Sequence, residues 1–488
     1  MTALDAELSG PRDACGVFGA YAPGQSVAHL SYLGLYALQH RGQESAGIAV
    51  SDGEAITVVK DMGLVTQVFD ERRLAPLEGH LAIGHVRYST TGSSTWRNAQ
   101  PVYRGVADVG FALGHNGNLT NTEALAEDLG MLPGVLTSDS ELIGELLARA
   151  YGSSLRSDGR DLEHALEQVL PTLEGAFSLV LMDEAHLFGV RDRHGIRPLV
   201  LGKHEGGWVL ASETAALDIS GAHYVRDVEP GEMVAIDANG VRSIRFAEPD
   251  PKLCIFEFVY IARPDTQLYG QGVHAVRRRL GEELARQAPA AADMVMPVPE
   301  SGVPSAQGFA AASGIPYGDG FVKNRYVGRT FIQPNQKQRG TGVRLKLNPL
   351  RDNIRGKRLV VVDDSIVRGT TTRQIIALLR EAGATEVHFR VSSPPYRWPC
   401  FYGLDTGKRS DLLAADMSVG EVADYLGVDS LAYLDVERLV SATGSPPESF
   451  CTACFTGDYP VPVPDHDTKH ALEAAADAPR LPGAVELT

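Results

Sequence analysis

The chain has 488 residues, of which 44% are hydrophobic and 22% are charged. This length exceeds what one hydrophobic core usually organises, so the sequence predicts a soluble globular enzyme with two domains. The formal net charge of -16 excludes a general nucleic-acid binder, because phosphate backbones are bound through an excess of Lys and Arg.

The chain shows neither a membrane span nor a secretory signal. No stretch approaches the roughly 18 consecutive apolar residues that a spanning helix needs, and residues 1–14 lack a basic start followed by an apolar run. The five cysteines are an odd number in a long chain, which favours a reducing compartment over a disulfide framework. We therefore expect a cytoplasmic protein whose cysteines serve another purpose.

Two styles of sequence follow each other along the chain. From residue 15 to about 244, short β-rich runs are separated by turns, with helical patterns at 28–39 and 139–150, which predicts stacked antiparallel sheets with helices. From about Cys254, strands precede helices, which predicts a parallel sheet with crossovers. The expected elements there are a helix at 272–287, strands at 294–297 and 358–362, and a helix at 371–382.

Cys15 opens the first style and is followed by three motifs. Alone, a small cysteine ahead of a strand is more often a core residue than a nucleophile. After cleavage before Cys15, the thiol would gain an α-amine with a pKa near neutrality, so one residue would supply both nucleophile and base. Together with residues 38–47, 84–90 and 114–119, Cys15 resembles the class II glutamine amidotransferases, whose Ntn-hydrolase fold has four αββα layers.

The resemblance implies roles that suit the residue types. The Asn116 side chain and the Gly117 N–H would donate to the oxyanion of a tetrahedral intermediate. Arg87 would bind the glutamine α-carboxylate and Asp139 its α-ammonium group. Arg41 and Gly42 would lie beside the nucleophile. The alternative interpretations are a turn for 115–118, a structural ion pair for Arg87 and a helix cap for Asp139.

Three further features of this half are expected to be structural. An N-terminal nucleophile uses its own amine, so His85 and His115 are interpreted as oriented structural residues rather than bases. Residues 191–199 also match the amidotransferases and are expected to form a turn that shapes the domain.

The strongest motif of the second style is residues 359–372. Four apolar residues predict a buried parallel strand, Asp363 and Asp364 stand at its carboxyl end, and a Gly/Thr loop opens the next helix. Ligands of open α/β sheets bind at that edge, where a helix N-terminus can hold a phosphate. The stretch resembles the phosphoribosyl pyrophosphate (PRPP) loop of type I phosphoribosyltransferases. The expected PRPP ligands in it are Asp363, Asp364, Ser365, Val367, Arg368, Gly369, Thr370 and Thr371.

Two other segments complete this predicted site. Ser301 follows another apolar strand, and with Asp363 and Asp364 it is expected to hold Mg²⁺ on the pyrophosphate. Lys323 and Arg325 begin a basic stretch that continues to Lys346. It is expected either to close over the pyrophosphate or to form a solvated flexible face.

Both motif sets on one chain resemble the family of glutamine PRPP amidotransferases, and the likeness runs from residue 15 to about 458. The resemblance implies transfer of glutamine-derived ammonia to C1 of PRPP, which gives 5-phosphoribosylamine in the first step of purine synthesis. It also implies a homotetramer with feedback inhibition by purine nucleotides. Rival interpretations are another class II amidotransferase, which the PRPP loop opposes, and a non-enzymatic iron-sulfur or nucleotide-responsive regulator on the same fold.

The other four cysteines suit Zn²⁺ or an iron-sulfur cluster. The family members with a leader carry a 4Fe-4S cluster, and the resemblance implies its ligands here are Cys254, Cys400, Cys451 and Cys454. The expected division is a propeptide at 1–14, a glutamine amidotransferase domain at 15–250, a phosphoribosyltransferase domain at 251–462 and a flexible tail at 463–488.

Overall fold

The structure is a computed structural model that describes residues 14–88, 95–106, 109–131, 135–153, 161–324, 347–406 and 408–464. Contacts divide the chain into two units. The N-terminal unit contains the described part of Asp13–Leu253 together with Phe401–Asp405 and residues 461–464. The C-terminal unit contains Cys254–Cys400 and Thr406–Pro460, again where described.

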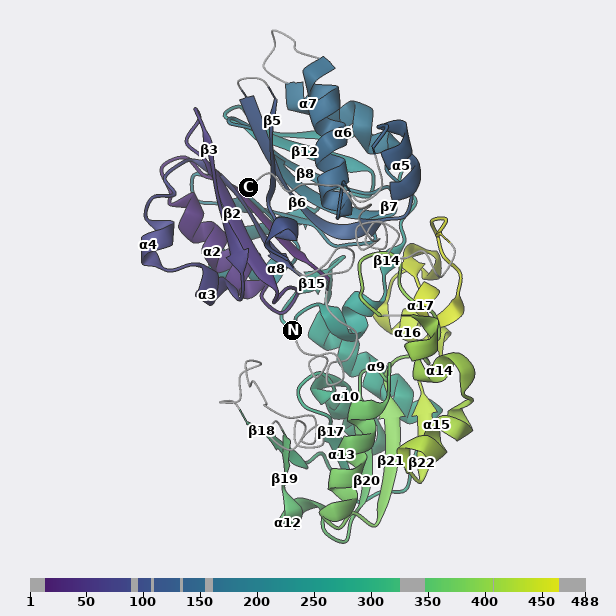
Figure 1. The fold of residues 1–488 in the computed structure, drawn as a ribbon. Coiled ribbons are helices and arrows are strands. Elements are labelled where there is room, and N and C mark those ends of the chain that lie inside the picture. Colours follow the sequence, from purple (N-terminus) through teal and green to yellow (C-terminus); the bar gives the residue numbers. More distant parts are fainter. Residues whose placement is uncertain are drawn as a thin grey trace, which may run out of the picture. The chain divides into compact units, whose positions relative to one another are not determined.

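The N-terminal unit contains two antiparallel sheets (Figure 1). The first has the strand order β11-β9-β10-β1-β4-β2-β3 and the second the order β13-β12-β8-β7-β6-β5. The strands of the first sheet are β1 Gly16–Tyr21, β2 Ser45–Ser51, β3 Ile56–Met62, β4 Leu81–Arg87, β9 Val200–His204, β10 Gly207–Ala211 and β11 His223–Asp227. Those of the second are β5 Val102–Val106, β6 Val109–Leu119, β7 Gly175–Met182, β8 Leu187–Arg191, β12 Glu232–Asp237 and β13 Gly240–Arg245.

Helices cover the outer face of each sheet. Three buried clusters fill the unit: one between the first sheet and its helices, one between the sheets, and one between the second sheet and its helices. The predicted four αββα layers are confirmed. The helices on the first sheet are α2 Val27–Ala37 and α8 Thr214–Ser220, with the short α3 Val65–Val68 and α4 Glu71–Leu74 near them; those on the second are α5 Thr122–Asp128, α6 Asp139–Ser153 and α7 Asp161–Val169.

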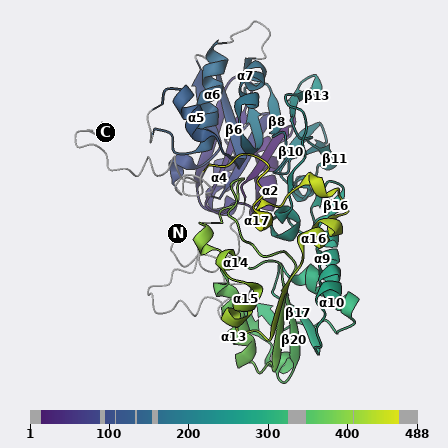
Figure 2. The ribbon, with the colours of Figure 1, turned by 90° about the vertical axis from the view of Figure 1, so that its right-hand side faces the viewer.

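The C-terminal unit is built on a parallel sheet in the order β17-β20-β21-β22, as predicted. Figure 2 shows α13 and α15 on one side of this sheet and α9 and α10 on the other. Leu359 and Val361 face the cluster that contains α13 and α15 because alternate residues of a strand point to opposite faces. The strands are β17 Met294–Pro297, β20 Arg358–Asp363, β21 Glu386–Val391 and β22 Ser430–Tyr433; the helices are α9 Val273–Gln287, α10 Val303–Ser313, α13 Thr370–Glu381, α15 Val419–Leu426 and α16 Val436–Thr443.

Smaller elements complete the unit and were not expected from the sequence. A π-helical turn, η3 Glu257–Ile261, follows Cys254, and the two-stranded pair β18 Phe321–Lys323 and β19 Leu347–Pro349 precedes β20. Among the described residues, no helix combines the length and apolar character needed to cross a membrane.

Candidate active sites

Cys15 lies directly before β1, in the middle of the first sheet, and is 6% exposed. Its Sγ donates to the Tyr88 carbonyl at 3.3 Å, and the Tyr88 N–H approaches the same sulfur at 3.5 Å. Burial raises the pKa of this thiol, the Tyr88 hydrogen bond and Arg87 lower it, and Asp139 and Glu44 raise it. Arg87 and Asp139 therefore lie close enough to act on the sulfur, as the predicted glutamine pocket requires.

Arg41 and Gly42 form the loop beside Cys15. The fully buried Arg41 donates through Nε to the Cys15 carbonyl at 3.4 Å and through Nη1 to Glu213 Oε1 at 2.9 Å. A Cβ at Gly42 would lie 2.6 Å from the Arg87 backbone nitrogen, so only glycine lets this loop approach β4 so closely. His40 also contacts Glu213 Oε1, at 2.8 Å.

Glu213 was not predicted as part of this site. A buried guanidinium needs a carboxylate partner, but the chain has 61 Asp and Glu residues and no motif marks this one. Glu213 precedes α8 and is itself fully buried.

Asn116 and Gly117 lie on β6, in the second sheet. Neither polar atom of the fully buried Asn116 side-chain amide has a hydrogen-bond partner among the described residues. A buried amide without a partner is costly, so this geometry suits a donor whose acceptor arrives with substrate. Gly117 has φ +153, and a Cβ there would lie 2.0 Å from the Ala176 carbonyl oxygen, so glycine is required.

Asp139 begins α6 and accepts hydrogen bonds from the N–H groups of Leu119 and Ser140. Burial opposes its ionisation, but His115, 3.5 Å away, and these N–H groups outweigh burial and lower the pKa of the carboxyl below its ordinary value. Asp139 is therefore an anion suited to an ammonium group.

The two histidines hold backbone and carboxylate groups in place. His85 Nε2 lies 3.0 Å from the His115 carbonyl oxygen, and burial lowers the pKa of His85 to about 3, which keeps it neutral.

In the turn at 191–199, Arg191 is fully buried and donates to the carbonyls of Arg197, Val228 and Gly195. These contacts suit the structural roles expected from the sequence.

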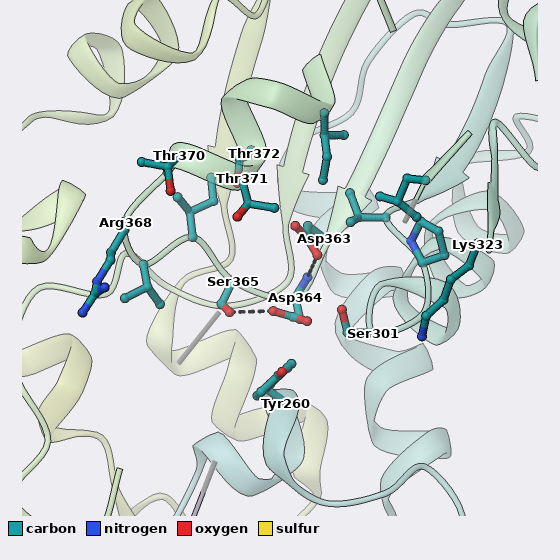
Figure 3. A pocket seen from close by; sticks show the side chains of 17 residues that line it. Tyr260, Ser301, Lys323, Asp363, Asp364, Ser365, Arg368, Thr370, Thr371 and Thr372 are labelled. Atoms are coloured by element: carbon teal, nitrogen blue, oxygen red, sulfur yellow. Dashed lines mark hydrogen bonds between the residues drawn. The ribbon is translucent and has the colours of Figure 1, made fainter. Parts of the chain in front are cut away.

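The second candidate site is a cavity of about 220 Å³ at the carboxyl end of the parallel sheet (Figure 3). The described residues that were predicted to bind PRPP or Mg²⁺ all line it. They are Ser301, Lys323, Asp363, Asp364, Ser365, Val367, Arg368, Gly369, Thr370 and Thr371. Arg325 and the rest of the basic stretch up to Lys346 lie outside the described residues.

Two neighbouring carboxylates end β20 inside this cavity. The Asp364 N–H donates to Asp363 Oδ1 at 2.9 Å, and Ser365 Oγ donates to Asp364 Oδ1 at 2.5 Å (Figure 3). Burial, followed by the charge of Asp364, raises the pKa of Asp363 well above its usual range. Burial also raises the pKa of Asp364, although Ser301 and Ser365 bind its carboxylate. Two crowded carboxylates of this kind are suited to a divalent cation.

The loop after Asp364 leads into α13. Gly369 adopts φ +74 at the helix N-cap, where a side chain would be strained. Thr370, Thr371 and Thr372, in the first turn of α13, then line the cavity, and a helix N-terminus of this kind is suited to bind phosphate. The sequence missed Tyr260, which reaches the same cavity from η3 (Figure 3).

The four remaining cysteines are buried in the C-terminal unit and are between 7% and 9% exposed. Burial raises the pKa of Cys454 well above its ordinary value, and Cys254, Cys451 and Cys400 each raise it further. The other three thiols are therefore within electrostatic reach of Cys454, and a cationic centre would relieve their repulsion on ionisation. Among the described residues, no three His, Cys, Asp or Glu side chains are arranged to hold a single metal ion.

Comparison with known proteins matches both halves of the chain. Residues 85–219 match a glutamine amidotransferase domain and residues 267–393 a phosphoribosyl transferase domain. The chain is 55% identical to the amidophosphoribosyltransferase of Mycobacterium tuberculosis (strain ATCC 25618 / H37Rv) over 94% of this chain and 88% of that protein. It is 53% identical to the enzyme of the same name from Synechococcus elongatus over 95% and 94%.

Solved structures agree with these relatives. The chain is similar to the glutamine PRPP amidotransferase from B. subtilis complexed with ADP and GMP, with 43% identity and a TM-score of 0.86 over 92% of this chain and 98% of that one. A structure described as the allosteric regulatory enzyme of purine biosynthesis matches with 43% identity and a TM-score of 0.88 over 94% and 99%.

Proposed function

The chain belongs to the amidophosphoribosyltransferase family, and from that premise we propose which residues carry out each half of its reaction. The enzyme takes ammonia from glutamine and joins it to C1 of PRPP, which yields 5-phosphoribosylamine, pyrophosphate and glutamate. This reaction is the first step of de novo purine synthesis.

The glutamine half takes place at Cys15. Arg87 binds the α-carboxylate of glutamine and Asp139 its α-ammonium group, so that the side-chain amide faces the sulfur. The thiolate attacks the amide carbon, and Asn116 with the Gly117 N–H stabilises the oxyanion. Collapse of the intermediate breaks the C–N bond and releases ammonia, and water then hydrolyses the thioester to glutamate.

The glutamine half of the reaction also requires removal of residues 1–14. In the encoded chain the Cys15 nitrogen is part of an amide bond to Ala14 and has no basicity. Cleavage there frees an α-amine that can accept the thiol proton. N-terminal sequencing of active enzyme checks this step, and finding intact Met1 would contradict it.

The PRPP half takes place in the cavity at β20. Residues 365–371 bind the 5-phosphate through backbone N–H groups and hydroxyls, and Lys323 contributes positive charge near the pyrophosphate. Asp363, Asp364 and Ser301 would hold Mg²⁺, whose positive charge would stabilise the departing pyrophosphate.

The observation that carries the assignment is the Cys15 pocket. The charges of Arg87 and Asp139 act on the pKa of the Cys15 thiol, and the buried Asn116 amide has no partner among the described residues. Replacement of the sulfur by Cys15→Ser should abolish glutamine-dependent product formation, because the hydroxyl is a far weaker nucleophile. Formation of 5-phosphoribosylamine from added ammonia should persist, since the PRPP cavity is untouched. Retention of glutaminase activity by this variant would disprove the assignment.

Cys254, Cys400, Cys451 and Cys454 hold a 4Fe-4S cluster with a structural role. Support comes from four soft, buried thiols whose mutual repulsion a cationic centre relieves.

Iron analysis and visible absorption of anaerobically purified protein test the cluster. We expect about four irons per chain, as a 4Fe-4S cluster requires, and their loss in Cys451→Ser. Cys15→Ser is the matched control, because it removes the fifth cysteine and should keep the iron. Stoichiometric zinc in the unmodified protein would contradict the cluster.

Regulation and assembly are extended from relatives. The B. subtilis structure contains ADP and GMP, and we propose that purine nucleotides inhibit this enzyme. We also propose that the enzyme is a homotetramer and that it is located in the cytoplasm. Inhibition assays with purine nucleotides and light scattering of the purified protein test these two statements.

A further inference from the structure

Five residues from the second half of the sequence, Phe401–Asp405, belong by their contacts to the N-terminal unit. We call them the inserted loop. The chain leaves the C-terminal unit after Cys400 and returns to it at Thr406, where the Cys400 N–H donates to Thr406 Oγ1 at 2.9 Å. Residues 401–404 are buried, which is unusual for a loop and indicates a packing role.

The inserted loop binds the strand that carries the predicted oxyanion donors. Asn118, on β6, donates through Nδ2 to the Phe401 carbonyl at 3.0 Å. Arg197, in the turn at 191–199, is fully buried and donates through Nε to the Tyr402 carbonyl at 2.8 Å. Both bonds fix the backbone of the loop rather than its side chains.

Directly after these two anchored residues, Gly403 packs against Gly117. A Cβ at Gly403 would lie 3.1 Å from both Cα and the carbonyl carbon of Gly117 and 3.2 Å from its oxygen. Gly403 also has φ +103, a conformation that other residues rarely adopt. β7 contacts the same glycine, because the Ala176 carbonyl would meet any Cβ at Gly117.

Gly117 has no side chain of its own to fix its position. An oxyanion donor must be held within a fraction of an ångström of its productive place. We propose that the inserted loop, through Gly403, positions Gly117 so that its N–H points to the developing oxyanion. Gly403 is then a positioning residue for glutamine hydrolysis, and the inference rests on the proposed oxyanion role of Asn116 and Gly117.

Gly403→Ala in the full-length, anaerobically purified enzyme tests the proposal. The added methyl group displaces Gly117, so we expect kcat for glutamine-dependent product formation to fall by about 10- to 100-fold, against about 100- to 1,000-fold when a donor is deleted outright. The KM for glutamine should stay unchanged, because Arg87 and Asp139 bind the substrate. The ammonia-dependent rate should also stay unchanged.

Gly240→Ala is the matched control. Gly240 has a similar φ of +113 in the same unit, but no heavy atom lies within 4 Å of a Cβ there, so this variant carries the backbone strain without the contact. The proposal is overturned if Gly403→Ala matches this control in kcat, raises only KM, or loses both activities in parallel.

Two further variants separate the possible failures. Asn118→Ala removes the donor to Phe401 without adding bulk; it should show the same fall in kcat at constant KM and tests the loop if Gly403→Ala does not fold. An unchanged kcat in Asn118→Ala would overturn the inference.

Asn116→Ala tests the oxyanion assignment itself. A normal kcat there removes the premise, whereas a low kcat with a normal Gly403→Ala overturns only the positioning role.

Discussion

Arg41 shows how a motif residue depends on a partner that no motif contains. The sequence could predict Cys15, Arg87, Asn116 and Asp139 as candidates because chemistry confines them to short segments with recognisable neighbours. Those roles remain predictions, although the structure brings the groups within reach of the sulfur. The carboxylate that holds Arg41 is contributed by a distant turn, and only the folded chain identifies Glu213.

We expect Glu213→Gln to destabilise the enzyme and to lower its glutaminase activity. Both side chains of the Arg41–Glu213 pair are fully buried, so loss of one charge leaves the other uncompensated, at a cost of about 3–5 kcal/mol. Chemical unfolding and kcat/KM for glutamine measure the two effects.

Asp293→Asn is the matched control for this substitution. It removes a carboxylate from the Arg358 ion pair, whose side chains are each 41% exposed and therefore solvated when alone. Equal unfolding midpoints for the two variants would show that burial of the Arg41–Glu213 pair is unimportant.

The elements that the sequence predicted best are those with strong periodicity. β17 has the expected bounds, and α9 and α13 begin within one residue of expectation. Apolar runs next to Gly/Thr loops leave little choice of structure there. The π-helical turn η3 and the helices after residue 412 escaped prediction, because apolar runs of only five to eight residues do not distinguish a helix from a strand by their periodicity.

Helices α9 and α10 pack so closely that glycines are required at their contact. A Cβ at Gly281 would lie 1.8 Å from the Ser305 carbonyl oxygen. Gly281→Ala should therefore force the helices apart and destabilise the C-terminal unit by about 1–3 kcal/mol, measured by chemical unfolding. Gly272→Ala, at the N-cap of the same helix, adds its methyl group to open space and should change the stability little. Similar midpoints for both variants would contradict the close approach.

At the scale of the molecule, the fold class and the reaction of each half were predictable because each half of the sequence carries its own set of motifs. The fold class and the activity are confirmed by relatives that span nearly the whole chain. The boundaries at 14, 250 and 462 stay predictions. The inserted loop could not be foreseen, because Phe401–Asp405 reads as an ordinary short apolar run within the second half.

Two sites on two units should be separable by substitution. Asp364→Asn removes a carboxylate from the PRPP cavity and should lower ammonia-dependent product formation by at least ~100-fold, a loss typical of a deleted electrostatic partner. Glutamine hydrolysis measured without PRPP should remain, since Cys15 and its pocket belong to the N-terminal unit. The exposed Asp352→Asn serves as control and should retain both activities. A parallel loss of both activities in Asp364→Asn would show that the two sites are not independent.

The inserted loop also limits how this gene could be divided. A break between codons 253 and 254 would produce a first polypeptide that lacks Phe401–Asp405 and residues 461–464 of its own compact unit, including the glycine that contacts Gly117. Evolution by fission, or an engineered split, would have to carry the codons of both segments across the break or replace the contacts of these segments. The two catalytic units have different chemistry, yet neither can be exchanged as one continuous segment of the chain.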